Sequence, residues 1–353
     1  MPPEVGRAYG SGMDAAVTGP SMPDVATSRQ AGETYRSLRE LGVHERPEGW
    51  VVARTEDLAV AVSAPQLSVA PPGPTHGALA RLQCRMARFS DDAAHRRRRV
   101  LVEALLPDPR ILEPAAAART AAGLDFGEAP FDVMPLARTV PIAVLAAALG
   151  VSAHDLDRVV ALVGAVCAAL APGAREPHDL TQDADAAATE LASHLAPLVP
   201  EGQDEVAAAI SVLFQARDAT AALIGSALVA SVTKAVDDCA SWIEWTVHHD
   251  APVQCTRRVA RADWAVDGVV VPAGSTVWLM LAAADTSPGP IAPTFGAGPH
   301  ACPGWSQALA MARGVVTAVH TAGWRAVPDQ LIDYERRPNL RLPARVMLRK
   351  QPT

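Results

Sequence analysis

The sequence predicts a mainly α-helical protein with a small β portion. Apolar residues recur at helical spacing over much of residues 115–200, and this periodicity is typical of helices with one buried face. A single long helix is predicted over Glu205–Val232, where alanine and other apolar residues dominate. β-branched residues predict a strand over Gly49–Arg54, and apolar runs within 265–280 predict a hairpin around the Pro-Ala-Gly turn at 272–274.

The chain is predicted to be one folded domain, residues 26–353, preceded by a flexible tail over residues 1–25. The tail is rich in Gly, Pro, Ser and Ala and shows no periodicity. The folded part is predicted to begin with a short helix over Ala31–Leu41, and Thr55 is expected to cap a helix over Glu56–Ser63.

The composition argues against nucleic-acid and membrane partners. The net charge of −7 provides no basic field for nucleic acid or an anionic bilayer, and no apolar run is long enough to span a membrane. Five cysteines are an odd number without close pairing, which fits a reducing compartment rather than a disulfide framework. The first residues show no signal-peptide pattern. We therefore expect a soluble, cytoplasmic protein.

One loop carries most of the chemical information: Phe295–Gly304, which is Phe-Gly-Ala-Gly-Pro-His-Ala-Cys-Pro-Gly. Its cysteine, Cys302, comes just before a helix predicted over Trp305–His320. The N–H groups and positive end of that helix would lower the pKa of the thiol and favour a ligating thiolate. The glycines allow a tight loop whose amides point at the sulfur. This pattern favours a metal ligand, and the alternative is a glycine-rich turn with a structural cysteine.

The motif F-G-x-G-x-H-x-C-x-G resembles the haem-thiolate loop of the cytochrome P-450 superfamily, here in a shortened and atypical bacterial-type chain. The resemblance implies a cytochrome P-450-like fold with a single haem domain. It also implies haem b (iron protoporphyrin IX), with Cys302 as the axial ligand of the iron. Phe295, Gly296 and Gly298 would surround that ligand.

Four further residues match positions that bind the haem propionates in the family. His95 and Arg99 fall four apart on a helix predicted from Asp91 and resemble the His-x-x-x-Arg pair of cytochromes P-450. Arg258 and His300 complete the expected set, because cationic donors stabilise a buried carboxylate. The alternatives are a solvated basic face for the helix and an ordinary strand-edge arginine for Arg258.

The long predicted helix resembles the one that crosses the distal haem face, where the family has Ala-Gly-x-acid-Thr. Aligned on Thr220, Ala216 matches, but Arg217 replaces the glycine and Ala219 replaces the acid. The Thr220 hydroxyl would bond dioxygen or an ordered water, unless it bonds the carbonyl one turn back. Asp218 lies about 100° around the helix from Ala219 and cannot simply substitute for the acid.

The Glu-x-x-Arg pair of the family is absent. Counting back from Pro252, Trp245 and His248 occupy its two positions. Glu244 and His248 are four apart and would form a weaker substitute pair. The segment before Phe295 is also short for the family and lacks the arginine that joins this network, so both partners are lost together.

Three functions are consistent with these residues. The first is a haem-thiolate oxidoreductase, a cytochrome P-450-like mono-oxygenase that tailors a small-molecule, secondary-metabolite substrate with electrons from ferredoxin and ferredoxin reductase. The second is a haem-thiolate enzyme of atypical chemistry: dehydration, rearrangement, ring closure or N–N bond formation. The third is a non-catalytic auxiliary partner of a glycosyltransferase. Such helpers tend to lose the cysteine loop, which this chain keeps.

Overall fold

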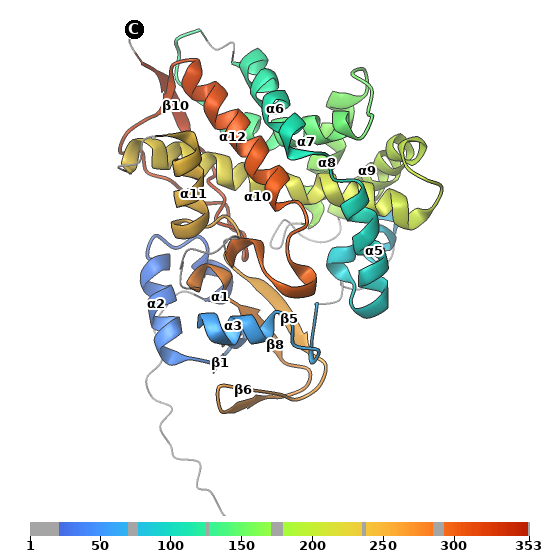
Figure 1. The fold of residues 1–353 in the computed structure, drawn as a ribbon, viewed down its shortest axis with the longest axis vertical. Coiled ribbons are helices and arrows are strands. Elements are labelled where there is room, and N and C mark those ends of the chain that lie inside the picture. Colours follow the sequence, from blue (N-terminus) through green and yellow to red (C-terminus); the bar gives the residue numbers. More distant parts are fainter. Residues whose placement is uncertain are drawn as a thin grey trace, which may run out of the picture.

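The computed structural model describes residues 21–69, 77–124, 127–170, 179–234, 238–284 and 293–351. Figure 1 shows most helices gathered in one large part of the molecule and most strands in a smaller part beside it. The prediction of a mainly α-helical fold with a small β portion is confirmed.

The helices differ greatly in length, and the long ones make up the larger part of the molecule. In the described residues they are α1 (Met22–Val25), α2 (Ala31–Leu41), α3 (Thr55–Ala61), α4 (Ala78–Gln83), α5 (Asp92–Ala104), α6 (Pro109–Gly123), α7 (Met134–Ala148), α8 (Leu156–Leu170), α9 (Asp179–Leu195), α10 (Gln203–Thr233), α11 (Cys239–His249) and α12 (Trp305–Thr321).

Helix α10 runs through the middle of the helical part and confirms the long helix predicted from the sequence (Figure 1). Asp204 and Glu205 lie in its first turn, where negative charge stabilises a helix N-terminus. By length and composition α10 could cross a membrane, but 67% of its most apolar window is buried inside the protein. This burial is typical of the core helix of a globular fold.

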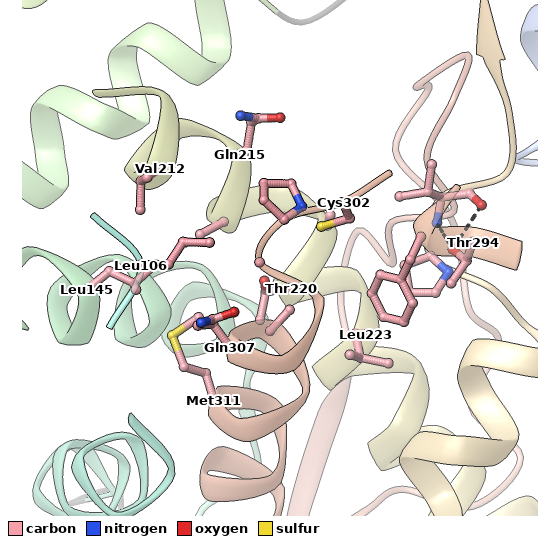
Figure 2. Close-up of a pocket in the computed structure, with 18 residues that line it drawn as sticks. Leu106, Leu145, Val212, Gln215, Thr220, Leu223, Thr294, Cys302, Gln307 and Met311 are labelled. Carbon is pink, nitrogen blue, oxygen red and sulfur yellow. Dashed lines mark hydrogen bonds between the residues drawn. The ribbon is translucent and has the colours of Figure 1, made fainter. Parts of the chain in front are cut away.

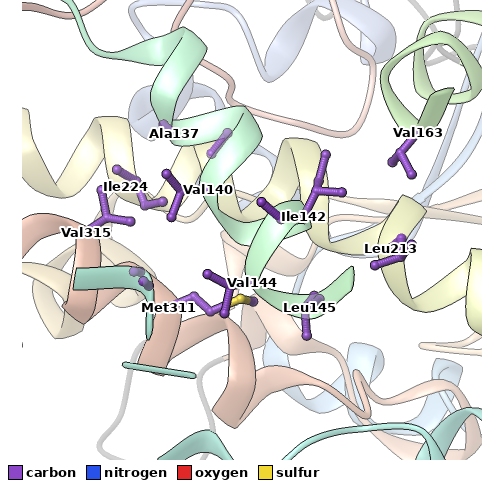
Figure 3. Close-up of a cluster of buried hydrophobic side chains, with 14 of the residues drawn as sticks. Ala137, Val140, Ile142, Val144, Leu145, Val163, Leu213, Ile224, Met311 and Val315 are labelled. Carbon is purple, nitrogen blue, oxygen red and sulfur yellow. The ribbon is translucent and has the colours of Figure 1, made fainter. Parts of the chain in front are cut away.

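Helices α7, α10 and α12 meet in the main hydrophobic core (Figure 3). Ile142 and Leu145 of α7, Leu213 and Ile224 of α10, and Val315 of α12 are all almost completely buried. Each removes a large apolar surface from water, and replacing such a residue by alanine typically costs about 2–5 kcal/mol. This core holds α10 against α12, and those two helices carry most of the site described below.

Helices α6 and α12 lie side by side and approach each other closely at Gly314 (Figure 1). A Cβ atom at this position would lie 2.3 Å from the Glu113 carbonyl oxygen and 3.0 Å from the Ala116 Cβ. Only glycine allows the two backbones to come this near without a shift. The contact therefore fixes the orientation of α12 behind the Cys302 loop.

The main sheet joins strands from the N-terminal region to two strands within residues 256–279. Its strand order is β1-β2-β8-β5-β3, with β2 and β8 parallel and the other neighbours antiparallel. The strands are β1 (His44–Arg46), β2 (Gly49–Val52), β3 (Leu67–Val69), β5 (Thr256–Ala260) and β8 (Thr276–Leu279). A smaller sheet has the order β4-β10-β9, with β4 (Phe131–Asp132), β9 (Trp324–Ala326) and β10 (Met347–Lys350).

The predicted hairpin within 265–280 was placed one turn too late. Strand β6 (Trp264–Val266) pairs with β7 (Val269–Val271), and β8 belongs to the main sheet instead. The hairpin turns at Asp267 and Gly268, whose φ angles are 48° and 75°. Asp-Gly is the residue pair that favours a two-residue turn with positive φ at both positions, and it outweighs the Pro-Ala-Gly signal.

The predicted tail is too long at its C-terminal end. Residues 1–20 lie outside the described residues, but Met22–Val25 form the short helix α1. The side chains of Met22 and Val25 are fully buried against the sheet region with Tyr35 and Trp278. These apolar residues hold the start of the chain against the fold. The glycine- and proline-rich composition around them gave no sign of this short helix.

Candidate functional site

A cavity lies between α10 and the loop that leads into α12 (Figure 2). Cys302 lines it from the loop, and Ala216, Ala219 and Thr220 line it from α10. Phe295 is also part of the wall. Thr220 and Cys302, which are 82 positions apart in the sequence, therefore face the same space.

The loop that carries Cys302 is held by its own backbone. The Cys302 N–H donates to the Phe295 carbonyl oxygen at 2.8 Å, which closes the loop. Gly296 and Gly298 have φ angles of 69° and 65°. At Gly298 a Cβ would also lie 2.6 Å from the Ser63 Oγ, so the loop lies against the end of α3 there. Both predicted glycines are thus required by the conformation of the loop.

The surroundings of Cys302 raise the pKa of its thiol and so favour the protonated form. Burial raises its pKa, while the Gly304 backbone N–H, Arg99 and Arg88 act in the opposite direction. Burial is the strongest of these influences, so the sequence-based prediction of a lowered pKa is wrong for the metal-free chain. A bound cation reverses this balance, because a thiol that coordinates a metal is deprotonated.

The Thr220 hydroxyl has no hydrogen-bond partner within the described part of the chain, although the residue is only 2% exposed. Other helical threonines behave differently. Thr120 and Thr246 donate to the carbonyl oxygens four residues back, at 2.7 and 2.8 Å. The alternative interpretation, that Thr220 bonds the preceding turn, is therefore not what the structure shows. Its hydroxyl is available to a molecule in the cavity.

Arg217 and Asp218 lie on α10 beside the cavity residues but are held by other partners. The Arg217 Nη1 donates to the Asp218 Oδ1 at 2.6 Å, and the Arg337 Nη2 lies 3.5 Å from the Asp218 Oδ2. Ala219, which replaces the acid of the family, is the residue that lines the cavity. Asp218 is not among the residues that line the cavity, which agrees with the prediction that it does not substitute for the acid.

The four predicted propionate-binding residues come from three elements and two of them are in direct contact. The rings of His95 on α5 and His300 in the cysteine loop have centroids 4.0 Å apart. Arg99 on α5 donates to the Ala301 carbonyl oxygen at 2.5 Å. Arg258 on β5 is 8% exposed, and its charge acts on both histidines. The set thus gathers beside the cysteine loop.

The pKa values of both histidines are lowered by their surroundings. Burial and the neighbouring His95 lower the pKa of His300 to about 3, and burial followed by Arg99 lowers that of His95. The His300 Nε2 lies 3.3 Å from the Asp91 Oδ1. Both shifts favour the neutral imidazole, and the positive charge beside the loop comes from Arg99 and Arg258.

The charges of this group fit the propionates of haem. Arg99 has Glu103 as an ion-pair partner at 2.6 Å, but Arg258 has no carboxylate at ion-pair distance among the residues that the structure describes. Its Nη1 donates only to the Thr256 hydroxyl and the Arg257 carbonyl, each at 2.9 Å. A buried guanidinium without a counter-charge is costly, and a propionate would supply one.

Comparison with solved structures identifies the fold. The chain matches the cytochrome P-450 BioI, solved with an acyl carrier protein that carries hexadec-9Z-enoic acid, with a TM-score of 0.78 and 19% identity over 91% of this chain and 98% of that one. It matches CalO2 with a TM-score of 0.78 and 21% identity over 95% and 100% of the two chains. The chain has the cytochrome P-450 fold. The chain also matches PksS, a cytochrome P-450 of the bacillaene polyketide synthase of Bacillus subtilis. That match has a TM-score of 0.74 and 15% identity over 93% of this chain and 99% of that one. No family sequence model and no curated protein sequence matches the chain.

Within this P-450 fold, the expected substitute for the Glu-x-x-Arg pair does not form. Glu244 is exposed, and the His248 Nδ1 is buried without a hydrogen-bond partner in the described ranges. Both residues lie on α11, but the Glu244 side chain extends to solvent. The two residues have helical spacing, but the exposed Glu244 side chain does not reach the buried Nδ1 of the half-buried His248.

Arg341, in the C-terminal segment, lies next to the site because its N–H donates to the carbonyl oxygen of Pro252, which lines the cavity. Arg341 donates to the Asp250 Oδ1 at 2.5 Å and to the Ala26 and Ser28 carbonyls at 3.1 and 2.9 Å. No local pattern pairs Arg341 with Asp250, since they are 91 positions apart.

Proposed function

We propose that this protein is a haem-thiolate oxidoreductase of the P-450 type that acts on a small molecule. The observation that carries the proposal is that the Cys302 sulfur and the unpaired Thr220 hydroxyl face one cavity. Bound haem b would supply redox-active iron for oxygen chemistry. Cys302 would bind that iron, while Arg99, Arg258 and the two histidines would hold the propionates.

The other residues that line the cavity indicate how a proton would be delivered and what kind of substrate would fit. The Thr220 Oγ1 would hold a water or dioxygen molecule and pass a proton at that atom. Apolar side chains make up most of the wall, among them Leu106, Val212 and Met311, and they exclude bulk water. The substrate is accordingly expected to be largely apolar. We retain secondary-metabolite tailoring, a cytoplasmic location, a haem domain over residues 26–353 and a ferredoxin system as parts of this proposal.

The absorption spectrum of the reconstituted protein tests the proposal. Purified protein incubated with haem should show a Soret band, and its reduced carbon-monoxide complex should show the red-shifted band of thiolate ligation. Cys302→Ala should lose that band, whereas Cys84→Ala, at an exposed cysteine, should keep it. A protein that stays colourless, or whose spectrum is the same after Cys302→Ala, would contradict the proposed ligand.

A second candidate, haem-thiolate chemistry without mono-oxygenation, is favoured by one observation. The carboxylate nearest to Thr220 in sequence, Asp218, is held by Arg217 and Arg337, and Ala219 takes the place of the acid at the cavity. Proton delivery would then depend on water or substrate. Product formation without reductant would support dehydration, rearrangement or ring closure, and strict dependence on reductant and oxygen would support mono-oxygenation.

The retained cysteine loop also bears on the third hypothesis. A non-catalytic partner of a glycosyltransferase would have no need of the closed Cys302 loop or of the unpaired guanidinium of Arg258. These features support catalysis over an auxiliary role. Haem binding in the spectral experiment distinguishes the two, because the auxiliary role does not require it.

A further inference from the structure

Four residues with polar side chains line the otherwise apolar cavity, and two of them are paired within the protein. The four are Gln215, Thr220, Thr294 and Gln307. The Thr294 hydroxyl accepts from the Val253 N–H and donates to the Val253 carbonyl oxygen, each at 3.1 Å. The Gln307 Nε2 donates to the Pro107 carbonyl oxygen, and its Oε1 accepts from the Ser306 hydroxyl, each at 3.0 Å. Thr294 and Gln307 thus use both ends of their polar groups inside the protein.

The Gln215 amide is held in one orientation by Ser211, one turn earlier in α10. The Gln215 Nε2 donates to the Ser211 Oγ at 2.7 Å and to the Ser211 carbonyl oxygen at 3.3 Å. A carbonyl oxygen only accepts, so the nitrogen of the amide and not its oxygen must face Ser211. Ser211 is completely buried, which fixes the partner in place. The Gln215 Oε1 therefore points away from Ser211.

The Gln215 Oε1 is an acceptor without a partner in the described part of the chain. In the view of Figure 2, the oxygen end of the amide lies on the side of Cys302 and the nitrogen end on the far side. The neighbouring wall residues Leu145 and Val212 have no side-chain donor to offer. An acceptor that loses water to an apolar molecule without gaining a hydrogen bond costs free energy. The cavity therefore favours a molecule that brings its own donor.

Gln215 and Thr220 contact different parts of a bound molecule. They are five residues apart on α10, which places them about 7.5 Å apart along the helix axis. In the proposed function the Thr220 hydroxyl acts at the reacting end of the substrate. The Gln215 oxygen would then bind a group that does not react, and such a contact determines specificity and orientation rather than chemistry.

We propose that Gln215 is a specificity-determining residue whose Oε1 accepts a hydrogen bond from a hydroxyl or amide N–H of the substrate. The inference rests on the proposed function and narrows its substrate class. The preferred molecule is largely apolar, to suit the cavity wall, and carries one hydrogen-bond donor at a distance from the reacting atom. Ser211 is a positioning residue, because it turns the Gln215 oxygen outward.

The test uses two isomeric probes, dodecan-1-ol and 1-methoxyundecane, which have the same atoms and apolar length. The alcohol has a donor, whereas the ether oxygen can only accept. Calorimetry of haem-treated protein gives the affinity for each probe and hence the alcohol-to-ether ratio. Gln215→Met keeps the length of the side chain but removes the acceptor. The ratio should be about 3- to 10-fold higher in the wild type than in this variant, which is the effect of one neutral hydrogen bond.

Gln307→Met is the matched control, because Gln307 lines the same cavity with its amide already paired. It should keep the wild-type ratio even where it changes both affinities. The same ratio in wild type and Gln215→Met would overturn the proposal, as would an equal loss for both probes, which indicates a structural role. Wild-type protein that binds neither probe would also overturn it. Absence of a haem spectrum would contradict the proposed function instead, and the two affinities would still report the donor preference.

Discussion

The Arg341 guanidinium donates to the Asp250 carboxylate at 2.5 Å and lies 3.9 Å from the centre of the Tyr334 ring. Asp250 immediately follows α11, and the Arg341 N–H donates to the Pro252 carbonyl at 2.9 Å. Pro252 lines the cavity that contains Cys302. One arginine thus links the C-terminal segment, the end of α11 and a wall of the site, in a chain that lacks the Glu-x-x-Arg pair.

Arg341→Met should therefore destabilise the fold. Only 13% of the Arg341 side chain and 25% of the Asp250 side chain are exposed, so removing the arginine leaves a poorly hydrated carboxylate without its partner. We expect a loss of about 1.5–3 kcal/mol in the free energy of unfolding, measured by urea denaturation.

Arg336→Met is the matched control for this prediction. Arg336 also pairs with an aspartate, Asp24, at 3.0 Å, but its side chain is 80% exposed. Exposed ion pairs contribute little because water screens them. Two variants with the same urea midpoint would show that the Arg341 pair has no special structural role.

Alanine substitutions at two helical glycines, Gly314 at the α6–α12 contact and Gly32 in α2, should change the free energy of unfolding in opposite directions. Gly314→Ala should lower the free energy of unfolding by about 1–3 kcal/mol, because the new methyl group would clash with the Glu113 carbonyl. Gly32→Ala should raise it by about 0.5–1 kcal/mol, since Gly32 lies in α2 with open space around it. Thermal unfolding of both variants measures the difference, and a stable Gly314→Ala would contradict the close packing.

The sequence placed residues in the correct structural element where a local pattern defines that element. Cys302 and its glycines lie in one ten-residue loop, and Thr220 lies on a helix with a clear apolar pattern. The predictions that the structure contradicts, or that the sequence could not make, concern residues whose partners are set by tertiary packing rather than by local spacing. Glu244 and His248 have helical spacing but different burial, and Arg341 pairs with Asp250 through tertiary packing that no short pattern encodes.

His320 makes a prediction about the pH dependence of stability. Its ring packs on Trp242 with centroids 4.3 Å apart, its Nε2 lies 3.2 Å from the Ser231 Oγ, and burial lowers its pKa from 6.5 to about 4. Between these two values the unfolded chain binds a proton that the folded chain does not. The stability that His320 contributes is therefore present above pH 6.5 and is lost as the pH falls toward 4.

His320→Gln keeps a polar group near Ser231 but cannot titrate. Its free energy of unfolding should decrease less steeply than that of the wild type between pH 6.5 and 4.5, as measured by urea denaturation at each pH. His154→Gln, at an exposed histidine, should keep the wild-type slope. Parallel pH profiles for wild type and His320→Gln would disprove the contribution of His320.

Thr220 gives the prediction that most directly separates the two catalytic candidates. If the protein activates oxygen, Thr220→Ala removes the hydroxyl that would pass a proton in the cavity. Product formation should then fall by about tenfold or more, while peroxide release rises. Because Thr220 makes no hydrogen bond to the preceding turn, its loss should leave the fold and the haem spectrum unchanged.

Thr220→Ser is the control that isolates the hydroxyl from the rest of the side chain. It should restore most of the coupling between reductant consumed and product formed, because the Oγ remains. Equal coupling in wild type, Thr220→Ala and Thr220→Ser would exclude Thr220 from proton delivery. Together with Ala219 at the position of the family's acid and Asp218 held by two arginines, that result would favour chemistry that does not depend on oxygen activation.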